Sequence, residues 1–278
     1  MPLVCLPQPY DFALSTERFR AFGPDLANLW HEGGLHRVVG GREVRIEPSP
    51  GGVRVEPLDG GIELVVRKLL GAEFDLAAFY GWAETADEVL ARISSALRGF
   101  RPPLAPDPFE TLVTSITAQQ VSLRAAFAIR NRMLLRFGER AEHAVAFPSR
   151  GRLATARPEE LVGLGLSRRK IDYVVAVARA DLDLDALAAL PDKEVKVRLI
   201  ALPGIGEWTA DWFLARHLAR PEAWPAGDLG LRKAVAAFYR GGRDVSTEEV
   251  RVIGARFAPF QNLTAHYLLT ALRVAPPS

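Results

Sequence analysis

The hydrophobic pattern of this chain changes near residue 80, and this change limits the possible folds more than any other feature. Before residue 80, short alternating segments at residues 37–39, 44–46, 53–55 and 62–66 are separated by pairs of glycines. Apolar residues that alternate with polar ones between glycine turns predict antiparallel strands. After residue 80, apolar residues recur at helical spacing almost to the end of the chain. The sequence therefore predicts an α+β fold, in which a small N-terminal antiparallel β-sheet domain precedes an all-α domain.

Capping residues indicate where helices of the second part begin. Thr85 and Glu88 have the spacing of a capping box ahead of a helix to about residue 98. Asp107 precedes Pro108 at another predicted start. Further helices are predicted to start at Ser122, Ser167 and Ser246, and a last helix is predicted at residues 263–273. We place the two domains at residues 1–84 and 85–278.

Composition limits the class of protein. A chain of 278 residues with 49% hydrophobic residues can bury the cores of two domains. Its one cysteine, Cys5, excludes a disulfide framework, a Cys-ligated zinc site and an iron–sulfur cluster. No run of about 18 apolar residues occurs, and the N-terminus lacks a signal-peptide pattern. We expect a cytoplasmic protein, nucleoid-associated if it acts on DNA, with no membrane partner.

Charge is distributed unevenly along the chain. The net charge is +2, but residues 1–100 hold 10 basic and 14 acidic residues, whereas residues 101–278 hold 25 basic and 19 acidic residues. A basic second part suits a polyanionic partner such as nucleic acid. A solvated surface explains the charge distribution at least as well when charge is considered alone.

A glycine-rich turn follows Leu202 and separates two helical patterns. Gly204 and Gly206 allow a tight turn and leave backbone N–H groups open to a ligand. Such N–H groups at a helix N-terminus bind phosphate, so the amides of Gly204, Gly206 and Thr209 are candidate DNA-strand contacts. Carbonyls of the same turn, from Leu202 and Ile205, could hold a monovalent cation, Na⁺ or K⁺. An ordinary turn between helices is the alternative interpretation.

Two tryptophans and one acid complete the stretch. Trp208 and Trp212 are four residues apart and therefore share one helical face, either as core residues or as a wall for a flipped-out base. Asp228 stands before another helical pattern, where it could be an N-cap, a functional carboxylate or both.

The turn, the Thr209-Ala210 pair and Asp228 together resemble the HhH-GPD superfamily of DNA base-excision glycosylases, and within it the 3-methyladenine DNA glycosylase II (AlkA) type. Residues 115–122 and 164–171 resemble two further segments of that type, and Tyr10 to Phe12 its N-terminal sheet domain. The resemblance covers most of the chain. It implies two helical subdomains with the active-site cleft between them.

The resemblance also implies roles for single residues. Asp228 aligns with the catalytic aspartate, which stabilises oxocarbenium character on the sugar. Trp208 stands where lyase-competent relatives carry a nucleophilic lysine, so base removal is expected to occur without strand cleavage. The indoles of Trp208 and Trp212 are expected to attract a cationic, N-alkylated base by cation–π interaction.

Two positions depart from the type. Gln120 occupies the place of the side chain that is wedged into the DNA stack, where the type has leucine. Leu269 stands where the type places a second tryptophan of the base pocket. Arg168, Arg169 and Lys170 are either phosphate contacts or a solvated helix start, and His217 and His266 are interpreted as structural.

These observations predict a monofunctional DNA glycosylase that flips out alkylated purines such as 3-methyladenine and hydrolyses the N-glycosidic bond, leaving an abasic site. The expected partner is double-stranded DNA containing damaged bases, the expected state is a monomer, and no cofactor is required. An HhH-GPD glycosylase for oxidised purines is one alternative, although those relatives keep the lysine that Trp208 replaces. A non-catalytic, damage-sensing DNA-binding protein is the other, although binding alone needs no carboxylate such as Asp228 near a polyanion.

Overall fold

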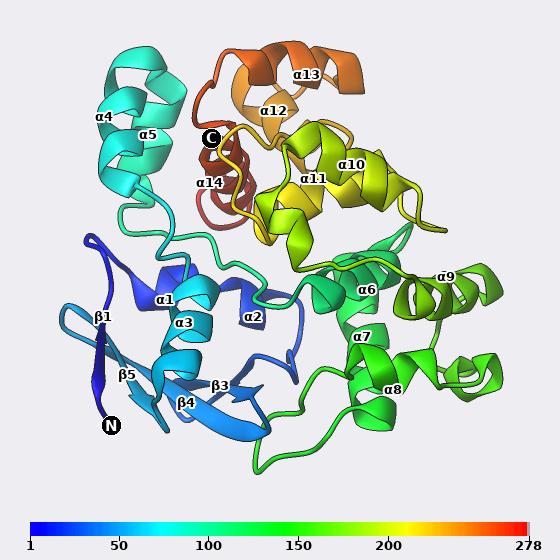
Figure 1. The fold of residues 1–278 in the computed structure, drawn as a ribbon. Coiled ribbons are helices and arrows are strands. Elements are labelled where there is room, and N and C mark those ends of the chain that lie inside the picture. Colours follow the sequence, from blue (N-terminus) through cyan, green and yellow to red (C-terminus); the bar gives the residue numbers. More distant parts are fainter. Residues whose placement is uncertain (277–278) are drawn as a thin grey trace.

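The computed structural model describes residues 1–276, with an antiparallel sheet at one end of the molecule and helices over the rest (Figure 1). The sheet has the strand order β1-β5-β4-β3-β2, and all neighbours are antiparallel. The strands are β1 (Leu3–Cys5), β2 (Leu29–His31), β3 (Gly34–Val39), β4 (Arg42–Ser49) and β5 (Gly52–Glu56). The predicted α+β fold is confirmed, and the predicted strands at residues 37–39, 44–46 and 53–55 lie within β3, β4 and β5.

The strand predicted at residues 62–66 is wrong, because this segment is helix α3 (Gly60–Leu69). Asp59 caps the helix by accepting the backbone N–H of Ile62 at 2.9 Å. The helix buries Ile62, Val66 and Leu69, which are spaced four and three residues apart and join the core beneath the sheet. This helical spacing and the cap outweigh the local β-propensity of the apolar run.

Helices make up the remainder of the described chain. Two short helices, α1 (Phe12–Ser15) and α2 (Arg18–Ala21), follow β1. The later helices are α4 (Leu76–Ala86), α5 (Glu88–Ala96), α6 (Pro108–Ala118), α7 (Leu123–Phe137), α8 (Arg150–Ala154), α9 (Arg168–Arg179), α10 (Asp192–Ile200), α11 (Glu207–Arg216), α12 (Leu229–Tyr239), α13 (Thr247–Ala255) and α14 (Gln261–Val274), with short 3₁₀ turns at Pro158–Leu161 and Ala186–Ala189. No helix within residues 1–276 combines the length and apolar character needed to cross a membrane.

Most predicted helix caps are confirmed. Asp107, Ser122, Ser167 and Ser246 each accept a backbone N–H at the start of α6, α7, α9 and α13. The predicted cap at Thr85 is wrong, because α4 continues through this residue and Asp87 caps α5 instead.

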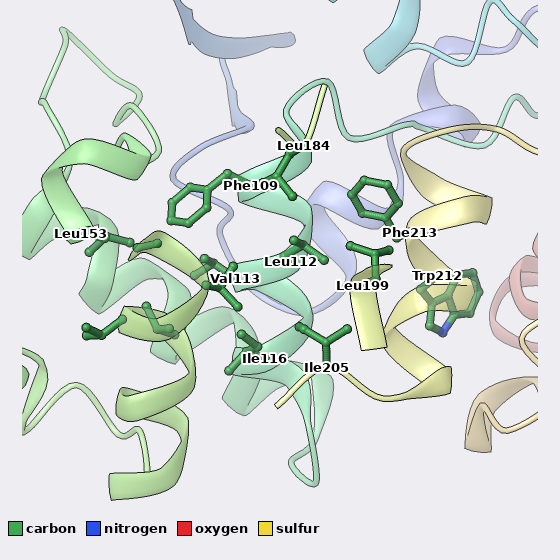
Figure 2. Close-up of a cluster of buried hydrophobic side chains, with 14 of the residues drawn as sticks. Phe109, Leu112, Val113, Ile116, Leu153, Leu184, Leu199, Ile205, Trp212 and Phe213 are labelled. Atoms are coloured by element: carbon green, nitrogen blue, oxygen red, sulfur yellow. The ribbon is translucent and has the colours of Figure 1, made fainter. Parts of the chain in front are cut away.

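Residues 1–276 contain three large apolar cores and a small cluster of Ala27, Leu134 and Val145. The first lies between the sheet and α3. The second is formed by the helices from α6 through α11, and the third by α4, α5, α12, α13 and α14. Figure 2 shows part of the second core, with Trp212 at its edge. The predicted domain boundary between residues 84 and 85 is wrong, because it cuts α4. The sheet core ends at Leu70 and the helical cores begin at Phe74, so the division lies between these residues.

Buried ion pairs attach the sheet domain to the helical part. Arg37 on β3 contacts Glu110 on α6, with 2.5 Å between Nη2 and Oε2, and both side chains are buried. Asp25, ahead of β2, pairs with Arg130 on α7, and both of these are buried as well. A buried charge that loses its partner is strongly unfavourable, so these pairs favour one orientation of the sheet domain.

Breaking the Arg37–Glu110 pair should therefore destabilise the protein. Glu110→Gln is expected to lower the free energy of unfolding by about 3–5 kcal/mol, because Arg37 is then left buried without a counter-charge. The double variant Arg37→Leu/Glu110→Leu should recover part of that loss. Urea unfolding of the wild type and the two variants measures both effects. A double variant no more stable than Glu110→Gln would contradict this account.

Candidate active-site cleft

The carboxylate of Asp228 accepts three hydrogen bonds. Its Oδ1 accepts the backbone N–H of Leu231 at 2.9 Å, which makes Asp228 the N-cap of α12. Its Oδ2 accepts the indole N–H groups of Trp208 at 2.9 Å and Trp212 at 3.1 Å. The predicted cap is thus confirmed, and the second oxygen adds a role that a cap does not require. Hydrogen bonds to an ionised acceptor are strong, and the N-terminus of α12 also favours negative charge.

Local sequence explains this placement. Trp208 and Trp212 share one face of α11 because they are four residues apart. A tight turn before α12, in which the N–H of Asp228 bonds to the carbonyl of Pro225 at 2.9 Å, brings the carboxylate to that face. The contact joins α11, at the edge of the second core, to α12 in the third core.

Trp212, which the sequence predicts to stack on a flipped-out base, lines the cleft described next but is largely covered by its neighbours. The residue is only 2% exposed and belongs to the second core. The guanidinium carbon of Arg216 lies 3.5 Å from the centroid of its ring, and His266 contacts the ring edge-on at 5.7 Å. The cation–π position over Trp212 is therefore filled by a cation of the protein. Trp208 is half-buried and lines the cleft described next.

A cleft of about 1230 Å³ opens in front of Asp228. Trp208, Leu269, Gln120 and the glycines of the turn line it, so the structure brings together the residues that the sequence singled out. Leu269 extends from α14 and approaches the backbone of Gly230 at the start of α12. Residues of α2 line the opposite side, so the sheet domain contributes to the site.

Three arginines of this cleft were missed by sequence reasoning. Arg18 lies on α2, Arg216 on α11 and Arg273 on α14. Burial, together with the charge of Arg273, lowers the pKa of Arg18 to about 10 although Asp228 opposes the change. Burial and the charge of Arg18 hold the pKa of Arg216 well below its ordinary value. No sequence pattern links three residues so far apart, and only the fold gathers their charges beside Asp228.

Two histidines interpreted as structural are buried. His217 makes a 2.8 Å hydrogen bond between its Nδ1 and the carbonyl of Ala105, which supports that interpretation. His266 packs against Trp212, and burial beside Arg216 holds its pKa well below the ordinary value. It is therefore neutral at pH 7 and adds no charge to the cleft.

The glycine-rich turn has the geometry expected of a backbone ligand site. Gly204 has a φ of +81°, and a side chain there would meet the ring of Tyr173 on α9. Within residues 1–276, no carbonyl accepts the backbone N–H groups of Gly204, Gly206 and Thr209. The carbonyl of Leu202 accepts the N–H of Ile205 at 3.1 Å and closes the turn.

The loop between α6 and α7 is held against this turn. The side chain of Gln119 donates to the carbonyl of Gly204 at 2.8 Å, and Gln120 is exposed with a φ of +54°. Lys170 donates through Nζ to the carbonyls of Thr117 at 3.1 Å and Gln119 at 2.6 Å. Lys170 therefore binds carbonyls at the C-terminal end of α6, and its contact with phosphate stays a prediction. Gln119 is a positioning residue that sequence reasoning missed.

This chain is similar in sequence and fold to known DNA repair proteins. The HhH-GPD superfamily base excision DNA repair protein family matches residues 113–259. The DNA-3-methyladenine glycosylase of Bacillus subtilis is 29% identical over 206 residues, which cover 71% of this chain and 68% of that protein. The 3-methyladenine DNA-glycosylase from Archaeoglobus fulgidus has a TM-score of 0.90 and 27% identity, over 99% of both chains. The Schizosaccharomyces pombe 3-methyladenine DNA glycosylase Mag1, in complex with abasic DNA, has a TM-score of 0.63 and 26% identity over 73% of this chain and 100% of that chain.

The chain belongs to the HhH-GPD superfamily of base excision DNA repair proteins. Within that superfamily it is similar to the DNA-3-methyladenine glycosylases, as the sequence resemblance predicted.

The hydrogen bonds of Asp228 predict a measurable contribution to stability. Asp228→Ala should lower the free energy of unfolding by about 1–3 kcal/mol, because α12 loses its cap and buried indole N–H groups lose their acceptor. Asp244→Ala, at an exposed acid after the same helix, is the matched control and should be nearly neutral. Equal unfolding midpoints for Asp228→Ala and the wild type would show that these bonds do not form.

Proposed function

We propose that this chain is a monofunctional DNA glycosylase that removes damaged, alkylated purines from double-stranded DNA and leaves an abasic site. The observation that carries the proposal is the carboxylate of Asp228, which faces the cleft while three N–H donors hold it in place. A cap needs only the Leu231 bond. Two additional indole donors fix the direction of the second oxygen, as a catalytic group requires.

The carboxylate acts in this proposal by charge. Cleavage of an N-glycosidic bond builds positive charge on the sugar, and a fixed carboxylate stabilises that charge as it develops. Three hydrogen bonds fix the direction of this carboxylate, so its proposed effect is electrostatic stabilisation of that charge. The flipped nucleotide lies in the cleft with C1′ beside Asp228 and its base towards Leu269 and Trp208.

Backbone and loop groups position the DNA strand. The free N–H groups of Gly204, Gly206 and Thr209 bind a phosphate near the flipped nucleotide, and Gln120 enters the space that the nucleotide leaves. The carbonyls of Leu202 and Ile205 in this turn bind a monovalent cation, Na⁺ or K⁺. The hydrogen bond from the N–H of Ile205 to the carbonyl of Leu202 supports this assignment, because it keeps the two residues close together.

The residue at position 208 excludes a Schiff base at that position. The indole of Trp208 is no nucleophile, and its N–H is committed to Asp228. Base removal therefore proceeds by attack of water, and the sugar–phosphate strand stays intact. The same residue argues against the oxidised-purine glycosylases with lysine chemistry, and Asp228 argues against a purely damage-sensing protein.

The cationic cleft bears on which damaged bases are released. The same cleft as Asp228 is lined by Arg18, Arg216 and Arg273. Like charges repel, so we expect these groups to reduce, but not to abolish, the advantage of a cationic alkylated base over a neutral base with acceptor atoms at its edge, such as hypoxanthine. The guanidinium of Arg216 already lies over the ring of Trp212, so we assign the stacking contact with the base chiefly to Trp208.

Base release from methylated duplex DNA tests the proposal directly. Asp228→Asn should reduce the single-turnover rate at least about 100-fold, a loss of about 2.7 kcal/mol in transition-state stabilisation, and leave binding to abasic-site DNA nearly unchanged. Asp244→Asn is the control and should keep full activity. A wild type that binds the lesion but releases no base would establish the damage-sensing alternative.

Sodium borohydride tests the monofunctional chemistry. The wild type should give no covalent protein–DNA adduct, because no amine is present at position 208 to form a reducible imine. Trp208→Lys provides the comparison, since it restores the amine found in lyase-competent relatives. An adduct with the wild type would require a nucleophile elsewhere and would overturn this part of the proposal.

Substrate competition tests the effect of cleft charge. Arg216→Gln should raise the release of 7-methylguanine relative to hypoxanthine by about fivefold to tenfold, because a unit charge at roughly 8 Å contributes about 2 kcal/mol at an effective dielectric constant of about 20, before screening by solvent. Arg168→Gln, at a residue that does not line the cleft, is the control. An unchanged ratio would show that the guanidinium of Arg216 does not act on the base.

A further inference from the structure

Three of the five histidines of the chain gather far from the sequence motifs of the cleft. His31 ends β2, His36 lies on β3, and His143 lies in the segment between α7 and α8. Their ring centroids are 4.4 Å apart for His31 and His143, 4.9 Å for His36 and His143, and 5.8 Å for His31 and His36. None of these residues lines the cleft in front of Asp228.

The sheet register brings an acid to the same group. His36 is paired with Leu29 on β2, and Val38 with Glu43 on β4. Because side chains alternate along a strand, His31, His36 and Glu43 share one face of the sheet. In Figure 1 the segment between α7 and α8 reaches the sheet near β4. The backbone N–H of His143 bonds to Glu43 there, and the ring of His143 lies against that of His36.

Glu43 connects the sheet to the segment between α7 and α8. Its Oε1 lies 2.7 Å from Nδ1 of His36, and its Oε2 accepts the backbone N–H groups of His143 at 2.8 Å and Ala144 at 3.1 Å. Glu43 therefore orients the ring of His36, in the way that a carboxylate orients a metal-binding histidine.

The ring of His36 is left unsatisfied by the protein. His36 is only 3% exposed, and no partner within the described residues reaches its Nε2. A buried ring nitrogen without a partner is unfavourable, so such an atom points to a missing ligand. His36, Glu43 and His143 offer ligand atoms that all lie within 4.8 Å of one another. His31 is partly exposed and can turn its ring to complete the set.

We propose that His31, His36 and His143 bind one divalent transition-metal ion of the zinc class, with Glu43 orienting His36 and supplying negative charge. Imidazole nitrogens are preferred ligands of such ions, whereas Mg²⁺ and Ca²⁺ require oxygen donors. Two ligands come from the sheet and one from the helical part. The ion therefore fastens the segment between α7 and α8 to the sheet and stabilises the join between the domains. It takes no part in base removal at Asp228.

Zinc binding to the tag-free, full-length chain tests this site. After equilibrium dialysis against Zn²⁺, elemental analysis should find one ion per chain, and Zn²⁺ should raise the unfolding temperature of the wild type. His143→Asn should weaken Zn²⁺ affinity at least about 100-fold, because even outer-shell partners of a metal contribute about 10- to 100-fold. His31→Asn should weaken it as well, and neither variant should raise its unfolding temperature with Zn²⁺.

Glu139→Gln is the matched control, since Glu139 is an exposed acid of the same segment outside the histidine group. It should bind Zn²⁺ like the wild type. Cys5→Ser, which removes the exposed thiol, should also bind normally. No Zn²⁺ binding by the wild type, or equal affinity in His143→Asn with unchanged circular dichroism, would overturn the proposal. The release of damaged bases is independent of these outcomes, so failure here leaves the proposed function untouched.

Discussion

The interaction on which the rest of this structure depends is the set of three hydrogen bonds to Asp228. One bond starts α12, and the other two tie that helix to the indoles of α11. Since α11 packs in the second core and α12 in the third, the carboxylate is also a joint between the two helical cores. Fold stability and the direction of the Asp228 carboxylate thus rest on the same four groups.

The charge around this joint comes from the whole chain. Arg18 belongs to the sheet domain, Arg216 to α11 and Arg273 to the last helix, and Arg273 is in turn paired with Glu17 at 2.9 Å. Arg18 and Arg216 are partly buried, which strengthens their electrostatic effect, whereas Arg273 is exposed. The cleft therefore has a negative point, Asp228, within positive walls. In the reaction that we propose, Asp228 stabilises the positive charge that develops on the sugar, and the arginines favour the phosphate backbone and a base with acceptor atoms.

Local physics explains which parts of the fold could be predicted. The caps at Asp107, Ser122, Ser167 and Ser246 depend on residues within one helical turn, so sequence alone located them. The apolar run at residues 62–66 has the residue types of a strand, and its helical state is decided by the cap at Asp59 and by packing on the sheet. The domain division depends on which core α4 joins, which is a long-range choice.

By itself, the sequence determined the α+β class, the glycine turn, the position of Asp228 after two tryptophans and the absence of lysine at position 208. These follow from residue type and spacing over a few turns of helix, where geometry is set locally. Only the tertiary structure decided that Trp212 is covered by Arg216, that three arginines meet at the cleft and that three histidines meet at the sheet. Those arrangements join residues up to hundreds of positions apart, and packing alone determines which distant charges and rings become neighbours.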